Sequence, residues 1–413
     1  MDRPRALVIG GSLAGLFAAN LLRTIGWDVA VFERATADLA GRGAGLGTRE
    51  ELFTVIRRIG ITLDQSIGVE IHSRIGLDRN GETMCEVPVR SVATAWDRIY
   101  RALKGALPME LYRSGMQLER FEQDARCVRA FFTDGSYAEG NLLIGADGIH
   151  STVRRQLMPK LNPRYAGYVA WRGVAEERDV PASFRSIVFH HTNFCFPEGE
   201  LALSVPMPVF DVHARPSRRR CQFSWFRPVD YEITLPQMCT DLTGHCHGMS
   251  IPPPLIRPKL VAELKARAQS SLAPQIAALV SQAAQPVLQP IFDLESPRIA
   301  FGRTVLLGDA AFVARPHVGT GVTKAALDAQ CLMDALLAAG KDIDSALMRY
   351  DRERRQFGNW LVARGRYLGG YLEAQLACEE RTAVEFRRQP EIVMREFGGA
   401  GLIDGAAANA WHS

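Results

Sequence analysis

Short apolar runs alternate with amphipathic segments at the start of the chain. Residues 6–9 form an apolar run typical of a buried parallel strand, and residues 16–22 have the spacing of a helix. A second apolar run, residues 29–32, ends at Glu33. Because a strand, a glycine turn, a helix and a second strand follow one another here, the pattern predicts a βαβ unit and a parallel sheet.

The apolar patterns typical of helices and of strands continue along the chain and predict a mixed α/β (α+β) protein. We expect helices over residues 49–59, 96–104, 259–280 with a break at Pro274, 324–339 and 342–381. We expect a β-meander over 111–139, aromatic-rich strands between 165 and 226, and single strands at 142–144, 287–294 and 304–307. The domains follow as a discontinuous Rossmann-like domain (1–164 and 295–340), a smaller β-sheet domain (165–294), and a C-terminal helical region with a loose tail (341–413).

Composition narrows the class of protein. The net charge of +4 over 413 residues, with scattered basic residues, does not favour nucleic-acid binding. No run reaches the roughly 18 apolar residues of a membrane span. Eight cysteines without a CxxC pair, and no targeting segment, predict a cytoplasmic protein with reduced thiols. The loosely spaced cysteines and histidines of residues 239–247 fit no familiar zinc pattern, so we expect no metal.

A glycine turn follows the first strand. It reads Gly10, Gly11, Ser12, Leu13, Ala14 and Gly15. In the dinucleotide fingerprint G-x-G-x-x-G, the first glycine makes the turn, the second admits the pyrophosphate and the third lets helix and strand pack. Ser12 stands at the second place, where its small hydroxyl can still bind phosphate. A tight turn without a ligand is the alternative.

Glu33 supports the nucleotide interpretation. It closes the second strand 23 residues after Gly10, near the roughly 20-residue spacing of the carboxylate that binds ribose hydroxyls. Glu33 and the adjacent Arg34 are therefore expected at the adenosine end of the ligand.

Two later segments decide which nucleotide binds. Residues 145–154 (Gly-Ala-Asp-Gly-Ile-His-Ser-Thr-Val-Arg) and 303–311 (Arg-Thr-Val-Leu-Leu-Gly-Asp-Ala-Ala) resemble signatures of the group A FAD-dependent aromatic hydroxylases. The resemblance implies that Asp147 lies near the dinucleotide, and that Gly308 and Asp309 hold the ribityl chain of FAD. The alternative is that both aspartates only cap turns.

The resemblance extends to a loop before the helix at 324. It implies that Pro316, Gly319, Thr320, Gly321 and Val322 lie at the flavin ring, where backbone N–H groups can stabilise negative charge. Two positions depart from the family pattern: Phe312 replaces a common histidine, and Trp96 replaces a common arginine. The second glycine-rich loop, 41–47, is expected either to gate the flavin, with Arg42 near FAD, or to be an ordinary turn series.

The resemblance also implies a fold like that of p-hydroxybenzoate hydroxylase and a reaction. Residues 97–100, 165–174, 250–258 and 315–317 are similar to members that act on hydroxypyridines. FAD, NADH or NADPH, and O2 would then hydroxylate a small electron-rich aromatic ring, such as a hydroxypyridine or related N-heteroaromatic, through a C4a-hydroperoxyflavin. A phenolic substrate, a flavin oxidase or reductase of the same fold, and a non-catalytic flavoprotein are the alternatives.

Three residues are candidates for contact with the ring. His317 precedes the flavin loop and is a candidate acid–base group; a solvent-facing histidine is the alternative. Arg315 could hold an anionic ring, and His190, on an expected strand, is the third candidate. The long C-terminal helices and the second sheet are compatible with a homodimer.

Overall fold

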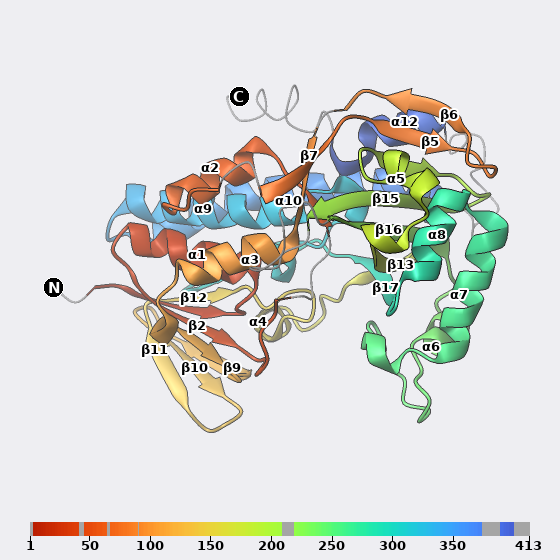
Figure 1. The fold of residues 1–413 in the computed structure, drawn as a ribbon. Helices are drawn as coiled ribbons and strands as arrows, with labels where there is room; N and C mark the ends of the chain where they lie inside the picture. The colour runs from red at the N-terminus through yellow and green to blue at the C-terminus, as the bar shows by residue number, and fades with distance from the viewer. Residues whose placement is uncertain are drawn as a thin grey trace.

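The computed structural model describes residues 3–40, 45–63, 67–89, 91–208, 219–373 and 389–399. Two large sheets organise this part of the chain, one on each side of Figure 1. The first carries the glycine turn, and the second carries the aromatic-rich strands. The mixed α/β fold class expected from the sequence is confirmed.

The first sheet has six strands in the order β18-β19-β12-β1-β2-β8. Their bounds are β1 Arg5–Ile9, β2 Asp28–Glu33, β8 Tyr112–Ser114, β12 Leu142–Gly145, β18 Ala300–Phe301 and β19 Thr304–Leu306. β1 pairs in parallel with β2 and β12, and β12 pairs in parallel with β19. The carboxyl ends of these strands therefore lie at one edge, where open parallel sheets bind ligands.

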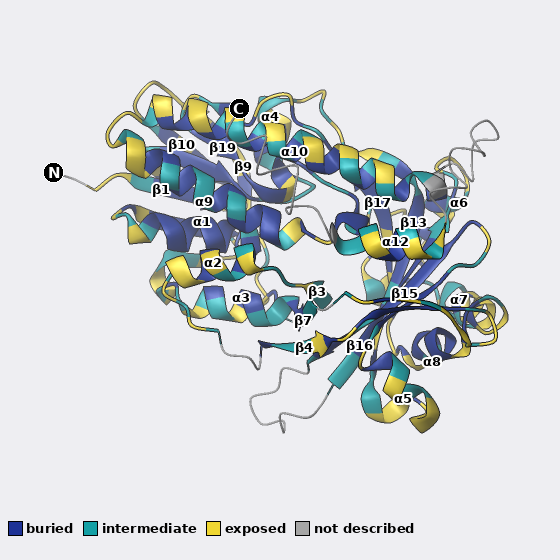
Figure 2. Cartoon of the chain, turned by 90° about the horizontal axis from the view of Figure 1, so that it is seen from above, coloured by how far each residue is buried: buried dark blue, intermediate teal, exposed yellow. Residues whose placement is uncertain are grey.

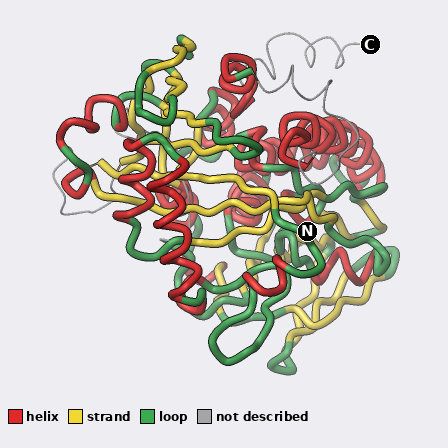
Figure 3. Tube along the Cα trace, turned by 90° about the vertical axis from the view of Figure 1, so that its right-hand side faces the viewer, coloured by secondary structure: helices red, strands yellow, loops and turns green. Residues whose placement is uncertain are grey.

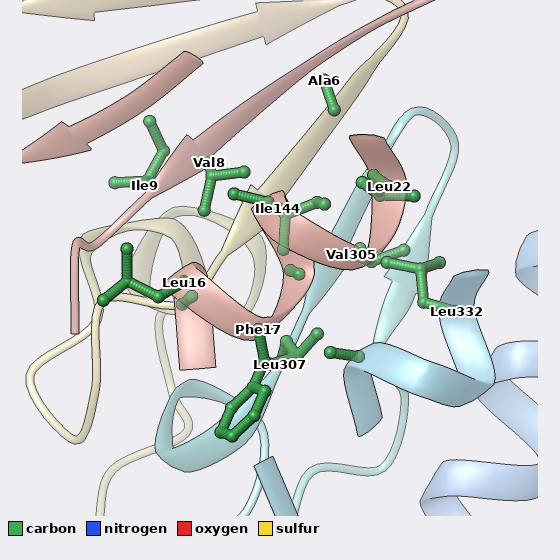
Figure 4. Close-up of a cluster of buried hydrophobic side chains, with 14 of the residues drawn as sticks. Ala6, Val8, Ile9, Leu16, Phe17, Leu22, Ile144, Val305, Leu307 and Leu332 are labelled. Carbon is green, nitrogen blue, oxygen red and sulfur yellow. The ribbon is translucent and has the colours of Figure 1, made fainter. Parts of the chain in front are cut away.

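Helices cover this sheet and exclude water from it. They are α1 (Leu13–Thr24), α2 (Glu50–Arg58), α3 (Trp96–Gly105), α4 (Thr152–Leu157), α9 (Gly321–Ala339) and α10 (Ile343–Glu373). Figure 4 shows Phe17 of α1 and Leu332 of α9 in one cluster with Val8 and Ile144 of the sheet. Helix α1 is accordingly buried along most of its length (Figure 2). The expected meander is present as β9 (Leu118–Gln123), β10 (Val128–Phe132) and β11 (Tyr137–Gly140).

The second sheet has seven strands in the order β17-β13-β16-β15-β14-β5-β6. Their bounds are β5 Arg74–Leu77, β6 Thr83–Val87, β13 Arg164–Glu176, β14 Thr192–Cys195, β15 Leu201–Pro208, β16 Arg219–Pro228 and β17 Val287–Asp293. Helices α7 (Pro258–Ser271) and α8 (Pro274–Gln282), separated at Pro274 as predicted, lie across its outer face (Figure 3). β5 and β6 come from inside segment 1–164, so this sheet also draws on residues outside the expected domain 165–294.

Several smaller elements were not expected. A three-stranded sheet is made of β3 (Gly45–Gly47), β7 (Ser91–Ala95) and β4 (Gly68–Ile71); it packs on β15 of the second sheet, and β7 also contacts α3. Helix α5 (Ala182–Val188) interrupts the aromatic-rich strands, and helix α12 (Pro390–Glu396) packs on β5 and β6. The rest of the expected tail, and the end of the expected helix beyond 373, lie outside the described residues.

Candidate active site

One cavity of about 900 Å³ extends from the glycine turn to the inner face of the second sheet. It begins at the carboxyl ends of β1 and β2, where Ile9 and Phe32 line it. Of the residues predicted to bind cofactor, those that line the cavity are Gly10, Ser12, Leu13, Ala14, Glu33, Arg34, Asp147, Asp309, Pro316, Gly319, Thr320, Gly321 and Val322. Gly11, Gly15 and Gly308 lie within the same turns without lining it, and Arg42 lies outside the described residues.

The glycine turn is shaped so that backbone faces the cavity. Gly10 has φ +106°, and a Cβ there would approach the carbonyl oxygen of Ala146 to 2.4 Å. A Cβ on Gly15 would lie 1.9 Å from the carbonyl oxygen of Gly10. Ser12 has an ordinary extended backbone and makes no side-chain cap to α1. Its hydroxyl and the N-terminus of α1 are therefore available to an anion such as a pyrophosphate.

Glu33 braces this turn as well as lining the cavity. Its Oε2 accepts the N–H of Gly11 at 2.8 Å, and its Oε1 accepts the N–H of Ala35 at 2.9 Å. A carboxylate has about four acceptor positions, so capacity remains for ribose hydroxyls. Arg34 is exposed beside it within the cavity lining.

Asp147 both caps a helix and presents a free oxygen. Its Oδ2 accepts the N–H groups of Thr152 at 2.7 Å and Val153 at 3.2 Å, at the start of α4. Its Oδ1 is buried and has no hydrogen-bond partner among the described residues. Burial raises the pKa of this carboxyl, although the hydrogen bonds it accepts work in the opposite direction. A buried acceptor without a partner is costly, which fits a ligand that donates a hydrogen bond here.

The Gly308–Asp309 segment rests on a buried charge network. Asp328 accepts bonds from Lys324 Nζ and Arg354 Nε, both at 2.7 Å, and from the N–H of Gly308 at 3.2 Å. Lys324 Nζ also donates to the carbonyl oxygen of Gly308 at 2.9 Å. These hydrogen bonds hold the turn at Gly308 in place, and the adjacent Asp309 lines the cavity. The i,i+4 spacing of Lys324 and Asp328 was the one signal for the network in the sequence.

The loop before α9 presents backbone to the other end of the cavity. Gly319 has φ +59°, and a Cβ there would lie 2.5 Å from the Cα of Gly398. Thr320 is the N-cap of α9 but makes no side-chain cap, and its buried Oγ1 has no partner among the described residues. The N-terminus of a 19-residue helix thus faces the cavity with its N–H groups available.

These observations fit FAD. The glycine turn would hold the pyrophosphate, Glu33 the ribose, Asp309 the ribityl chain, and the start of α9 the flavin ring. Positive charge is also present, because Arg34 and Arg155 line the cavity. Burial lowers the pKa of His150, and the charges of these two arginines lower it further. Of the two departures from the family pattern, Trp96 lines the cavity and stacks on Tyr100, with ring centroids 4.9 Å apart.

Phe312, the other departure, packs away from the cavity. It is buried against Gly358 of α10, where a Cβ would approach the phenyl ring to 2.3 Å. The phenyl ring of Phe312 therefore packs on α10 and does not face the cavity.

The second sheet forms the opposite wall of the cavity. Side chains alternate along each strand, and the inner face carries a mixture of apolar and polar groups. Those that line the cavity are Arg74, Arg172, Thr192, Phe194, Leu203, Val205, Gln222, Ser224 and Phe226. Gln222 also accepts the N–H of Gly45 at 2.5 Å, so part of the second glycine-rich loop is tied to this wall.

The C-terminal segment closes the cavity near Phe397 and Gly398, which line it. Arg74 donates to the carbonyl oxygens of Met394 and, at 2.6 Å, Phe397, and Arg49 donates to that of Gly398 at 2.8 Å. Burial, with the nearby charge of Arg49, lowers the pKa of Arg74 to about 10. Nothing in the sequence indicated that this segment returns to the site.

Arg315 lines the cavity, but its guanidinium is engaged elsewhere. It is ion-paired with the buried Asp293, with Nη2 and Oδ2 3.0 Å apart. Arg366 of α10 donates to the other oxygen of Asp293 at 2.7 Å. The side chain expected to hold an anionic ring therefore ties the loop before α9 to the end of β17, and Arg366 ties the same carboxylate to α10.

His317 lies behind the cavity wall. It is 1% exposed and does not line the cavity. Its ring contacts Phe226 and Phe397, and these two side chains do line the cavity. Its Nε2 shares a hydrogen bond of 2.8 Å with the hydroxyl of Tyr168. Burial, and then the charges of Arg315 and Arg172, lower the pKa of His317 to about 3. The alternative of a solvent-facing histidine is therefore wrong.

The structure places His190 outside the site. The expected strand is wrong here, because α5 ends at Val188 and His190 occupies an exposed turn before β14. It does not line the cavity.

No helix among the described residues combines the length and hydropathy needed to cross a membrane.

Comparisons with known proteins agree with this geometry. Residues 3–207 match the FAD binding domain family, and residues 165–293 match a family described as FAD binding domain-like. The chain is 33% identical to 2,6-dihydroxypyridine 3-monooxygenase of Paenarthrobacter nicotinovorans, over 86% of this chain and 88% of that protein. It is 27% identical to 6-hydroxynicotinate 3-monooxygenase of Bordetella bronchiseptica, over 86% and 88% of the two chains.

Solved structures give the same result. The structure of 2,6-dihydroxypyridine-3-hydroxylase from Arthrobacter nicotinovorans has a TM-score of 0.85 at 30% identity and covers 93% of this chain and 96% of that one. The similarity to hydroxypyridine-oxidising proteins expected from the sequence is therefore confirmed. A Klebsiella pneumoniae protein solved with FAD and uric acid shares the fold, with a TM-score of 0.75 at 24% identity over 96% and 94% of the two chains. The chain belongs to the FAD-dependent monooxygenases that hydroxylate aromatic rings.

Proposed function

We propose that this monooxygenase hydroxylates an electron-rich hydroxypyridine or a related N-heteroaromatic ring, with NADH or NADPH as the reductant and O2 as the oxidant. One observation carries the proposal. A single cavity joins the segments that fit FAD to a wall of apolar and polar side chains on the second sheet. A small ring bound at that wall would lie against the flavin end of the cavity.

Bound FAD would supply the redox chemistry, activating O2 and delivering one oxygen atom to the ring. The protein's part is to bind, orient and exclude water. Phe194, Leu203 and Phe226 supply apolar surface for a flat ring, and the C-terminal segment closes the site. A dry site protects a reactive oxygen species from loss to water.

Polar groups near this wall favour a ring that carries negative charge. Arg315 lines the cavity, but its ion pair with Asp293 offsets its charge, so it would stabilise a deprotonated ring hydroxyl only weakly. His317, with its lowered pKa, stays neutral and would act through its hydrogen bond to Tyr168. We therefore propose an electrostatic role for both residues. The imidazole would be uncharged at neutral pH and would not serve as a proton donor to the ring.

The relatives support a nitrogen heterocycle. Two of them are named for 2,6-dihydroxypyridine and 6-hydroxynicotinate, and the first is also similar over nearly the whole fold. Phenols remain the comparison class in the test.

The experiment is rapid-mixing reduction of the FAD-loaded protein by NADH and by NADPH, with and without each ring. We expect 2,6-dihydroxypyridine or a related hydroxypyridine to accelerate flavin reduction and to yield a hydroxylated product. Acceleration by phenols alone would overturn the substrate class. Equal reduction rates whatever ring is present would overturn the hydroxylase proposal.

The cellular compartment and the oligomeric state are part of the same proposal. We place the protein in the cytoplasm, since the described cysteines are all unpaired, as thiols are in a reducing compartment. We also propose a homodimer, for which sedimentation would give twice the mass of one chain.

A further inference from the structure

Arg172 is a cation in the cavity wall that has no ion-pair partner among the described residues. It lies on β13, in register with Ser224 of β16, and lines the cavity. No hydrogen bond or ion pair joins its guanidinium to any residue in the described part of the chain, and its Nε is buried without a partner. A planar guanidinium offers five N–H donors, so this is a large unmet hydrogen-bonding capacity.

The other arginines at this wall are engaged. Arg315 is paired with Asp293, and Arg74 donates to carbonyl oxygens of the C-terminal segment. Arg172 differs because none of the described residues on its own wall of the cavity is acidic. Among the described residues, the acidic ones that line the cavity are Glu33, Asp147 and Asp309, and all three belong to the segments that fit FAD.

The surroundings of Arg172 suit a flat anion. Ser224 and Gln222 on the adjacent strand supply polar atoms, while Phe226 and Leu203 supply apolar surface. Burying a guanidinium without a partner costs free energy, and a charged acceptor recovers it. Two N–H groups of an arginine can meet one anionic group in a bidentate arrangement.

We infer that Arg172 is a substrate-binding residue that holds an anionic oxygen of the ring and selects anionic rings over neutral ones. The inference rests on the proposed function and deepens it. The anionic oxygen could be a deprotonated ring hydroxyl or a ring carboxylate. Holding a ring hydroxyl as its anion would also enrich the ring in electrons, as electrophilic hydroxylation requires.

Equilibrium binding to the FAD-loaded protein tests this role without turnover. The probes are 2,6-dihydroxypyridine, 6-hydroxynicotinate and the neutral 2,6-dimethoxypyridine, followed by the perturbation of flavin absorbance at a pH where the first two are anions. The variants are Arg172→Gln and Arg172→Lys. Arg220→Gln is the matched control. Arg220 lies on the same face of β16 as Ser224, the residue opposite Arg172, but it is paired with Glu176 and does not line the cavity.

We expect Arg172→Gln to raise the Kd of anionic rings by about 10-fold or more, the effect of losing a charge-assisted hydrogen bond. Binding of the neutral ring should change little, Arg172→Lys should restore part of the loss, and Arg220→Gln should match the wild type. A loss for 2,6-dihydroxypyridine identifies a ring oxyanion, because that probe has no carboxylate, and a loss for 6-hydroxynicotinate alone identifies a carboxylate.

Two results would overturn the inference. One is unchanged affinity of Arg172→Gln for both anionic rings. The other is wild-type protein that binds the neutral ring as tightly as the anions. Protein that binds anions through Arg172 yet forms no hydroxylated product would instead overturn the proposed function and leave this inference standing.

Discussion

Replacing Asp328 by asparagine removes the negative charge that two buried cations share. Asp328 is 2% exposed, Lys324 is 2% exposed and Arg354 is 3% exposed. Burial alone would raise the pKa of the Asp328 carboxyl, but the charges of Lys324 and Arg354 outweigh it and lower this pKa. Asp328 is therefore ionised at neutral pH, and Asp328→Asn leaves two cations uncompensated.

The size of the effect follows from this burial. Removing one partner from a buried ion pair destabilises a protein by about 3–5 kcal/mol. An unfolding entropy of about 2.1 cal/mol/K per residue gives about 0.9 kcal/mol/K for 413 residues. The melting temperature of Asp328→Asn should therefore fall by about 3–6 °C. FAD affinity should fall with it, because Asp328 also accepts the N–H of Gly308.

Thermal unfolding of flavin-free protein measures the first effect, and titration with FAD measures the second. Asp334→Asn is the control on the same helix, since Asp334 pairs with Arg58 at the surface. Exposed pairs contribute about 1 kcal/mol or less, so this variant should melt within about 1 °C of wild type. Equal melting temperatures for the two variants would refute the stabilising role of the buried network.

Two other substitutions test the site directly. Gly10→Ala should abolish stable FAD binding, because its Cβ would meet the Ala146 carbonyl oxygen at 2.4 Å, whereas Ser12→Gly should retain it; equilibrium dialysis would show both. Folded His317 has a pKa of about 3 against 6.5 for an unperturbed histidine. The unfolded chain therefore binds an extra proton between these values, and stability falls by up to about 1.4 kcal/mol per pH unit as the pH is lowered. In urea denaturation, His317→Gln should reduce this acid sensitivity, and an unchanged profile would contradict the lowered pKa.

The cofactor half of the site was predictable because its requirements are local. A glycine at position 10, a small residue at 12 and a carboxylate at 33 are set by one βαβ unit, so spacing alone indicates them. Asp309 was indicated by the resemblance to a family signature, and it lies three residues after the buried strand β19 ends. These residues all line the cavity.

The substrate half depends on contacts between distant segments. Alternation along 165–174 places Trp171 and Arg172 on opposite faces, but it does not say which face meets the cavity. That is decided by α7 and α8, which cover the Trp171 side. The pairing of β5 with β14 and the return of residues 389–399 to the site are likewise non-local. His317 lies next to the loop predicted to contact the flavin ring, but its burial behind Phe226 has no sequence signature.

Isotope labelling tests most directly that this chain is an FAD-dependent ring hydroxylase. The FAD-loaded protein is supplied with NADH or NADPH and 2,6-dihydroxypyridine under ¹⁸O2, and the product is weighed by mass spectrometry. The account predicts a hydroxylated ring carrying one ¹⁸O atom, formed in proportion to the reductant consumed. Consumption of the reductant with hydrogen peroxide as the only product, for this ring and for every hydroxypyridine and phenol tested, would contradict it.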